Sequence, residues 1–129
     1  MSEVLGTFDL DHVCNTYTTD QNNYITNHSN WSGVAEGYGK IFGTLTFSPT
    51  AIGEMNETLE GGEVRWTGQG FLEDGTSVTG TGTGTWKKDP AGHVWHTDYE
   101  LLLNDGSKIR SIGQIELSSL KYSGANYSI

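Results

Sequence analysis

Apolar and polar residues alternate with a period of two along most of this chain. Such alternation is typical of strands that bury one face and expose the other. A first strand is predicted to carry Phe8, Leu10, His12 and Cys14 on one face. No segment of useful length shows the 3.6-residue apolar period of a helix. The remaining strands are predicted in GYGKIFGTLTF, EVRWTGQGFL, SVTGTGTGTW, HVWHTDYELLL, KIRSIGQIEL and LKYSGANYSI.

Two segments interrupt this alternation. Residues 18–32 are polar and are predicted to form a long loop or lid. Residues 48–62 fit no period clearly, with one further strand around Met55 as an alternative to loop.

Three turn sequences fix how the later strands pair. The Glu73–Gly75 and Asn104–Gly106 segments fit three-residue hairpin loops that end in a left-handed glycine. The Asp89–Gly92 segment fits a four-residue turn with proline at a position that presets φ. The predicted partners are Trp66–Gly82, Gly68–Gly80, Val64–Gly84, Trp86–Trp95, Gly84–Thr97, Gly82–Tyr99, Gly80–Leu101, Tyr99–Ser111, Leu101–Ile109 and Trp95–Ile115.

These registers place the apolar residues of four successive strands on one face. The chain is therefore predicted to be all-β, a single domain over residues 1–129 with little or no helix. We expect an antiparallel meander of about seven or eight strands closed into a barrel, because closure buries the inner face and removes exposed edges. A two-sheet sandwich is the alternative. The outer face is predicted to be polar, with Glu100 and Arg110 as a cross-strand pair of opposite charge.

The segment TGTGTGTW directs glycines 80, 82 and 84 into the interior between Trp66 and Tyr99. One explanation is steric: glycines let a small barrel curve sharply and let neighbouring rings lie over bare backbone. The other is that they hollow the interior for a ligand. A flat apolar ligand suits such an interior, with lining residues predicted as Trp66, Trp86, Trp95, Gly82, Thr97, Ser111 and Cys14.

His12 and Tyr99 are the candidate catalytic groups. His12 lies between Leu10 and Cys14 on the apolar face, so its imidazole is predicted to point inward as a core residue or as a general base. Tyr99 would be its polar companion. No metal site is predicted, because His96, Asp98 and Glu100 share the outer face.

Charge and composition limit the classes of partner that we expect. The formal net charge of −9 and the 7 scattered basic residues give no basic surface for nucleic acid or an anionic membrane. One cysteine allows no intrachain disulfide, and neither a secretory leader nor a transmembrane run is recognised, so a cytoplasmic location is expected. Apolar exceptions on the outer face suggest a homodimer patch: Phe71, Val94, Leu102 and Ile112.

The strand rhythm and DG turns of residues 36–117 resemble small calycin-type barrels, including lipocalin-like and allene oxide cyclase-like domains. The resemblance implies binding of a hydrophobic small molecule and, in some members, its isomerisation or cyclisation. It carries over no catalytic residue.

We therefore hypothesise a barrel that binds a hydrophobic or aromatic small molecule, and we favour a cofactor-independent isomerase or cyclase that acts on it. The alternatives are a non-catalytic carrier and a protein-interaction module with a filled core.

Overall fold

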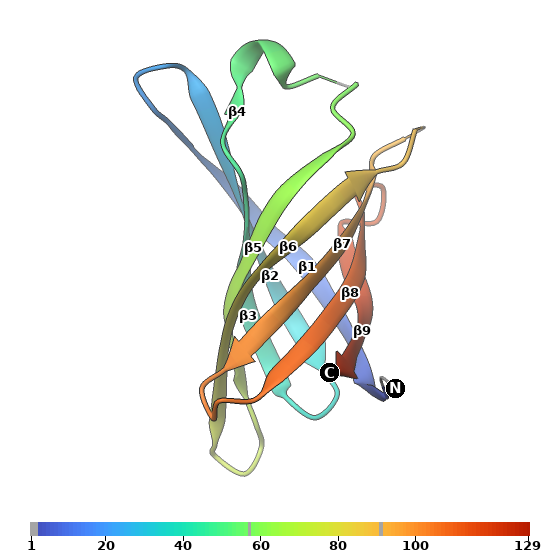
Figure 1. Cartoon of the computed structure of the whole chain (residues 1–129). Coiled ribbons are helices and arrows are strands. Elements are labelled where there is room, and N and C mark those ends of the chain that lie inside the picture. Colours follow the sequence, from blue (N-terminus) through green and yellow to red (C-terminus); the bar gives the residue numbers. More distant parts are fainter. Residues whose placement is uncertain (1–2, 57, 91) are drawn as a thin grey trace.

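The computed structural model describes residues 3–56, 58–90 and 92–129, which form nine antiparallel strands (Figure 1). The one helical element of this described part is the short 3₁₀ turn η1 (Ile52–Glu54). The strands are β1 (Val4–Thr19), β2 (Tyr24–Ala35), β3 (Gly39–Phe47), β4 (Thr50–Ala51), β5 (Gly61–Phe71), β6 (Ser77–Lys88), β7 (Val94–Leu103), β8 (Lys108–Glu116) and β9 (Lys121–Ser128).

Eight of the strands close into a barrel. Their order is β1-β9-β8-β7-β6-β5-β3-β2, and β1 pairs with β2 to complete the circle. The two-residue strand β4 adds to β2 at Tyr24 and Ile25. The predicted all-β meander barrel is confirmed, and its architecture is consistent with that of calycins. One end carries both termini, and the other carries the β3–β5 loop (Figure 1).

Two of the three predicted hairpin registers are confirmed. Trp66 lies opposite Gly82, and Tyr99 lies opposite Ser111. Gly75 and Gly106 have φ of 91° and 89°, the left-handed conformation expected for the last residue of these loops.

The predicted β6–β7 register is wrong by two residues. Trp86 faces Thr97 instead of Trp95, and Gly84 faces Tyr99. The backbone N–H of Asp89 donates to the carbonyl of Val94 at 3.0 Å, so the turn closes one residue later on each strand. Ala91, within this turn, lies outside the described residues. Because the shift is even, every side chain stays on its predicted face.

The predicted loop at residues 18–32 is instead the outer part of the long β1–β2 hairpin. Thr19 pairs with Ile25, and the Asp20 carboxylate accepts from the backbone N–H groups of Asn22 and Tyr24 at 2.8 and 3.1 Å. Most side chains near its tip are exposed, so no apolar alternation marks these strands. The strand predicted around Met55 is also wrong: β4 ends at Ala51, and Met55 follows η1.

Gly82 and Gly84 of β6 serve the steric role. A β-carbon on Gly82 or Gly84 would collide with the backbone of Glu100 or Asp98, so these glycines let β6 approach β7 closely. Ring packing over bare backbone also occurs, but elsewhere: the Trp66 indole covers Gly43 and Gly68.

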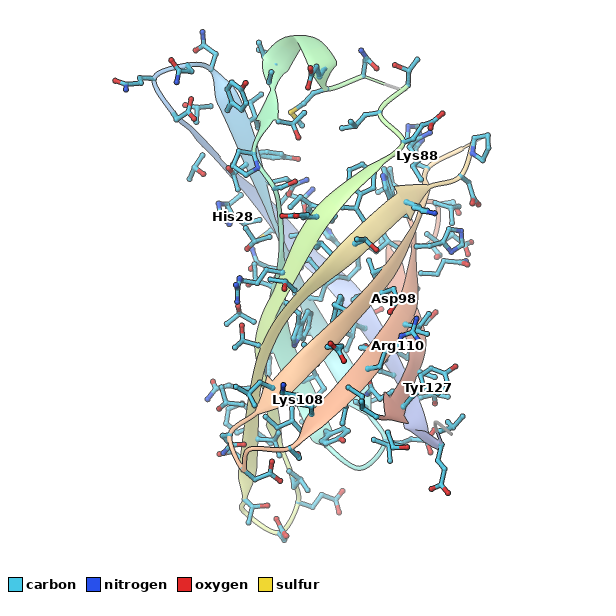
Figure 2. The ribbon with its side chains drawn as sticks, in the orientation of Figure 1. His28, Lys88, Asp98, Lys108, Arg110 and Tyr127 are labelled. Atoms are coloured by element: carbon cyan, nitrogen blue, oxygen red, sulfur yellow. The ribbon has the colours of Figure 1, made fainter. Side chains whose placement is uncertain are left out.

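The outer face is polar, and the ion pair made by Arg110 differs from the predicted one. Arg110 faces Glu100 in register, but its guanidinium binds the Asp98 carboxylate through two hydrogen bonds of 2.8 and 2.5 Å (Figure 2). The register also separates two members of the predicted dimer patch, because Leu102 faces Lys108 and Ile112 faces Asp98.

In the described part of the chain, no helix is long and apolar enough to cross a membrane.

Candidate functional site

Aromatic rings divide the barrel interior into two chambers. The ring of Trp31 packs against that of Tyr122 with centroids 5.5 Å apart, and Trp66 packs on the same tyrosine at 6.5 Å. Trp31 lines the space toward the β3–β5 loop, and Trp66 and Tyr122 line the space toward the termini. We call these the loop-end chamber and the termini-end chamber.

The termini-end chamber has a volume of about 70 Å³. A cavity of roughly 150 Å³ is known to bind benzene, so this space is small for a ring-sized ligand. It is the space next to Trp66 and Tyr99 where the sequence predicted a ligand, and Ser111 also lines it.

A hydroxyl network occupies the centre of the barrel. The Tyr122 hydroxyl lies 2.5 Å from that of Tyr99 and 2.7 Å from that of Thr97. Burial raises the pKa of Tyr99 well above its ordinary value and that of Tyr122 to about 12. Both phenols are neutral at pH 7, and their hydroxyl groups link β7 to β9 inside the barrel. Thr97, predicted to contact ligand, is 1 % exposed and belongs to this network.

The loop-end chamber is larger, at about 240 Å³. This is slightly below the roughly 300–1,000 Å³ usual for small-molecule sites, so it suits one or two fused rings. It is lined by His12, Asn15, Ile25, Asn27, Ser29, Trp31, Phe47, Ser48, Thr50, Met55, Leu59, Trp86, Trp95, Ile115 and Leu117.

One wall of the loop-end chamber is aromatic and aliphatic. Trp86, Trp95 and Ile115 come from the adjacent strands β6, β7 and β8. Phe47 extends this wall, with its ring edge-on to Trp86 at 6.0 Å and 85°. Such a wall presents flat apolar surface to a ring.

The facing wall is polar. In the closed order, β6 and β7 lie across the barrel from β1 and β2, which contribute four polar side chains: His12, Asn15, Asn27 and Ser29. The histidine and asparagine side chains of the lining thus all come from β1 and β2, whereas the wall across from them is largely aromatic. The chamber therefore suits an amphipathic ring system.

A β-bulge in β1 sets which side chains face this chamber. His12 pairs with Trp31, and Cys14 pairs with the next β2 residue, Asn30, so Val13 is the extra residue. The bulge turns Asn15 inward and leaves Cys14 exposed, with its Sγ accepting from Asn30 Nδ2 at 3.5 Å. The prediction that Cys14 lines the interior is wrong for this reason.

His12 lines the loop-end chamber, in the half-buried position that the bulge creates. Its Nε2 lies 2.8 Å from Asn15 Oδ1, and its ring packs edge-on against Trp31 at 5.1 Å. Tyr99 lies in the other chamber, so the structure does not bring the two predicted catalytic groups together. Gly82, also predicted to contact ligand, lines neither chamber.

The other predicted lining residues divide between the chambers. Trp86 and Trp95 line the loop-end chamber, and Trp66 lines the termini-end chamber. Within the described ranges, no group of three or more His, Cys, Asp or Glu side chains is placed to hold a metal ion. Outside the chambers, His96 Nε2 lies 2.8 Å from Asp89 Oδ1 on the surface.

The inner row of β2 was missed by sequence reasoning. Ile25, Asn27, Ser29 and Trp31 all line the loop-end chamber. Their spacing of two is typical of a strand. Two of the four residues are polar, however, so the segment lacks the apolar alternation that predicts one.

Two buried polar atoms in this row lack a hydrogen-bond partner among the residues that the structure describes. They are the Trp31 indole Nε1, a donor, and the Asn27 Oδ1, an acceptor. Buried polar atoms are hydrogen-bonded in the great majority of cases, so two unbonded atoms on one face of β2 are unusual.

No family model, no curated protein and no solved structure matches this chain.

Proposed function

We propose that this protein binds a small, flat hydrophobic or aromatic molecule in the loop-end chamber. The observation that carries the proposal is the chamber of about 240 Å³ between Trp86 and Trp95 on one side and polar β1–β2 side chains on the other. A concave site with apolar walls and a few polar groups is the usual form of a small-molecule site. The calycin-type resemblance supports the same class of ligand.

The chamber has an opening at the end of β8. Leu117 lines the chamber and yet is 44 % exposed, so its side chain lies where the chamber meets solvent. The β3–β5 loop contributes Met55 and Leu59 to the same lining. A ligand can therefore enter past small movements of half-exposed side chains.

Naphthalene tests the proposal as an uncharged probe of the right size. We expect it to bind with a Kd between about 1 μM and 1 mM and to shift the amide NMR signals around Trp31, Trp86 and Trp95. The Leu117→Trp substitution places a large ring at the opening, so it should weaken binding at least tenfold.

Leu102→Trp is the matched control, because Leu102 is 49 % exposed on the outer face of β7. It should bind naphthalene as the wild type does. No binding by the wild type, or equal binding by the Leu117→Trp variant, would contradict the proposal.

A reaction on the bound ligand is the second candidate. The observation that favours it is that His12 lies in the chamber wall, where a neutral imidazole can take up a proton from a bound molecule. Shape and exclusion of water promote isomerisation or cyclisation without further catalytic groups.

A further inference from the structure

The outer part of β1 has a free backbone edge. β1 pairs with β9 only as far as Asp11, and the last backbone bond on that side runs from the His12 N–H to the Leu120 carbonyl at 3.0 Å. On its other side, β1 continues to pair with β2 up to Thr19. In the part of the chain that the structure describes, no strand pairs with residues 13–19 on the β9 side. We call residues 13–19 the β1 edge segment.

The β1 edge segment is accessible from outside the barrel. The β1–β2 hairpin extends beyond the barrel wall at the loop end, and β4 lies against its β2 side (Figure 1). Every residue of the segment is exposed, with Val13 and Tyr17 each at 59 %. The backbone groups on the β1 side of the hairpin therefore face solvent.

The sequence of the segment does not protect this edge. Exposed edge strands usually carry charged residues or proline, which prevent pairing with another chain. The segment VCNTYTT has neither, and its valine, tyrosine and three threonines favour the extended conformation. The bulge at Val13 lies at the beginning of the segment, so the residues after it stay free to pair.

We propose that the β1 edge segment pairs antiparallel with the same segment of a second copy of this chain, so that two hairpins form one four-stranded sheet. This inference concerns a surface separate from the predicted outer patch, and it does not rest on the proposed ligand binding.

Two identical edges fit each other in one register. Opposite residues of an antiparallel pair share a face of the sheet, so the two-fold axis of such a dimer passes at a residue position. Thr16 is the middle residue of the segment. An axis at Thr16 pairs the whole segment, with Val13 opposite Thr19 of the second copy, whereas an axis elsewhere leaves part of the edge unpaired.

This register places compatible side chains opposite one another. On the outer face, Thr16 meets Thr16 of the second copy, a pairing that is favourable across strands. On the inner face, Asn15 meets Tyr17 of the second copy, and these two residue types already bond within one strand, where Asn15 Nδ2 donates to the Tyr17 hydroxyl at 3.2 Å. No pair contains a charged residue, so the net charge of −9 on each copy causes no direct repulsion along the edge.

The dimer also extends the wall of the ligand chamber. Asn15 lines the loop-end chamber, so the second copy brings its Tyr17 beside that wall.

Sedimentation equilibrium of the whole chain, up to about 1 mM, measures the pairing. One strand pair buries less surface than a standard interface, so we expect a dimer with a Kd on the order of 100 μM. Thr16→Lys places two ammonium groups at the axis and should raise this Kd about tenfold or more. Thr85→Lys makes the same change in charge at an exposed position of β6, and it should leave the Kd within about twofold.

Disulfide formation tests the register. In a Cys14→Ser background, Thr16→Cys places two thiols opposite each other with their Cα atoms about 4.5–5.5 Å apart, which a disulfide can bridge. Mild oxidation should therefore give mostly covalent dimer. Thr85→Cys in the same background should stay monomeric. The wild type should also stay monomeric, because its two Cys14 residues lie about 14 Å apart along the paired strands.

Each result supports or overturns the pairing. A chain that stays monomeric at the highest concentration overturns it, and so does a dimer that Thr16→Lys and Thr85→Lys weaken equally. A dimer in which the Thr16→Cys variant forms no disulfide shows that the copies associate through another surface. These tests are independent of naphthalene binding, because neither Thr16 nor Thr85 lines the loop-end chamber.

Discussion

At the scale of single residues, the polar wall of the loop-end chamber depends on the extra residue Val13. Without the bulge, strict alternation would direct Cys14 inward and Asn15 outward. With it, Asn15 faces the chamber and fixes the His12 imidazole by a 2.8 Å hydrogen bond. One inserted residue thus replaces a thiol by an amide in the chamber wall.

His12 distinguishes an enzyme from a carrier. We expect His12→Ala to leave the affinity for naphthalene within about threefold of wild type, because the ring surfaces come from Trp86 and Trp95 across the chamber. Any conversion that the wild type carries out, in an NMR screen of small unsaturated compounds, should fall at least a hundredfold in this variant.

His28→Ala is the control, because His28 bonds Thr18 and Thr46 and does not line the chamber. A wild type that converts nothing, together with a His12→Ala variant that loses affinity alone, would indicate a carrier.

At the scale of elements, the close contact between β6 and β7 depends on Gly82 and Gly84 of β6, which have no side chain. Gly84 faces Tyr99, and a β-carbon at Gly82 or Gly84 would enter the backbone of β7. These glycines allow the strong curvature of a narrow barrel. The threonines between them face outward, where Thr81 Oγ1 donates to the carbonyl of Trp66 at 3.0 Å.

Gly82→Ala should therefore lower the free energy of unfolding by about 2–4 kcal/mol, since the new methyl group meets backbone that cannot rotate away. Denaturant unfolding followed by tryptophan fluorescence measures the change. Gly53→Ala is the matched control, because nothing lies within 4 Å of a β-carbon there, and its effect should stay within about 0.5 kcal/mol. Equal effects of the two substitutions would show that the close approach of β6 and β7 is not what requires glycine.

At the scale of the whole molecule, carboxylates on the outer surface tie the stability of the barrel to pH. The hydrogen bond from Arg110 lowers the pKa of Asp98. Hydrogen bonds from Thr76 and Ser107 lower the pKa values of Asp74 and Asp105 in the two DG turns, and one from Thr7 lowers that of Glu36.

A group with a lowered folded-state pKa stabilises the fold fully above its unfolded pKa, near 4, and loses this contribution as the pH falls through the folded value. The free energy of unfolding should thus decrease as the pH is lowered from about 4 to 2. Asp98→Asn should show a shallower decrease in the same urea titrations. An unchanged slope in that variant would exclude Asp98 as a source of the acid sensitivity.

Local patterns determine most of the barrel. Period-two alternation marks the later strands, and the DG turns set two registers because a left-handed glycine ends each loop. The aromatic lining from Trp86 and Trp95 follows from the same alternation.

The fold class, the faces of most strands and part of the aromatic wall could be predicted from the sequence, since each follows from interactions between near neighbours. The position of the open space depends on the packing of the whole barrel. The β1 bulge, the shifted β6–β7 turn and the rings of Trp31, Trp66 and Tyr122 depend on strands far apart in the chain. Their packing reduced the space expected beside Tyr99 to about 70 Å³ and left the larger chamber at the loop end, against the polar inner row of β2.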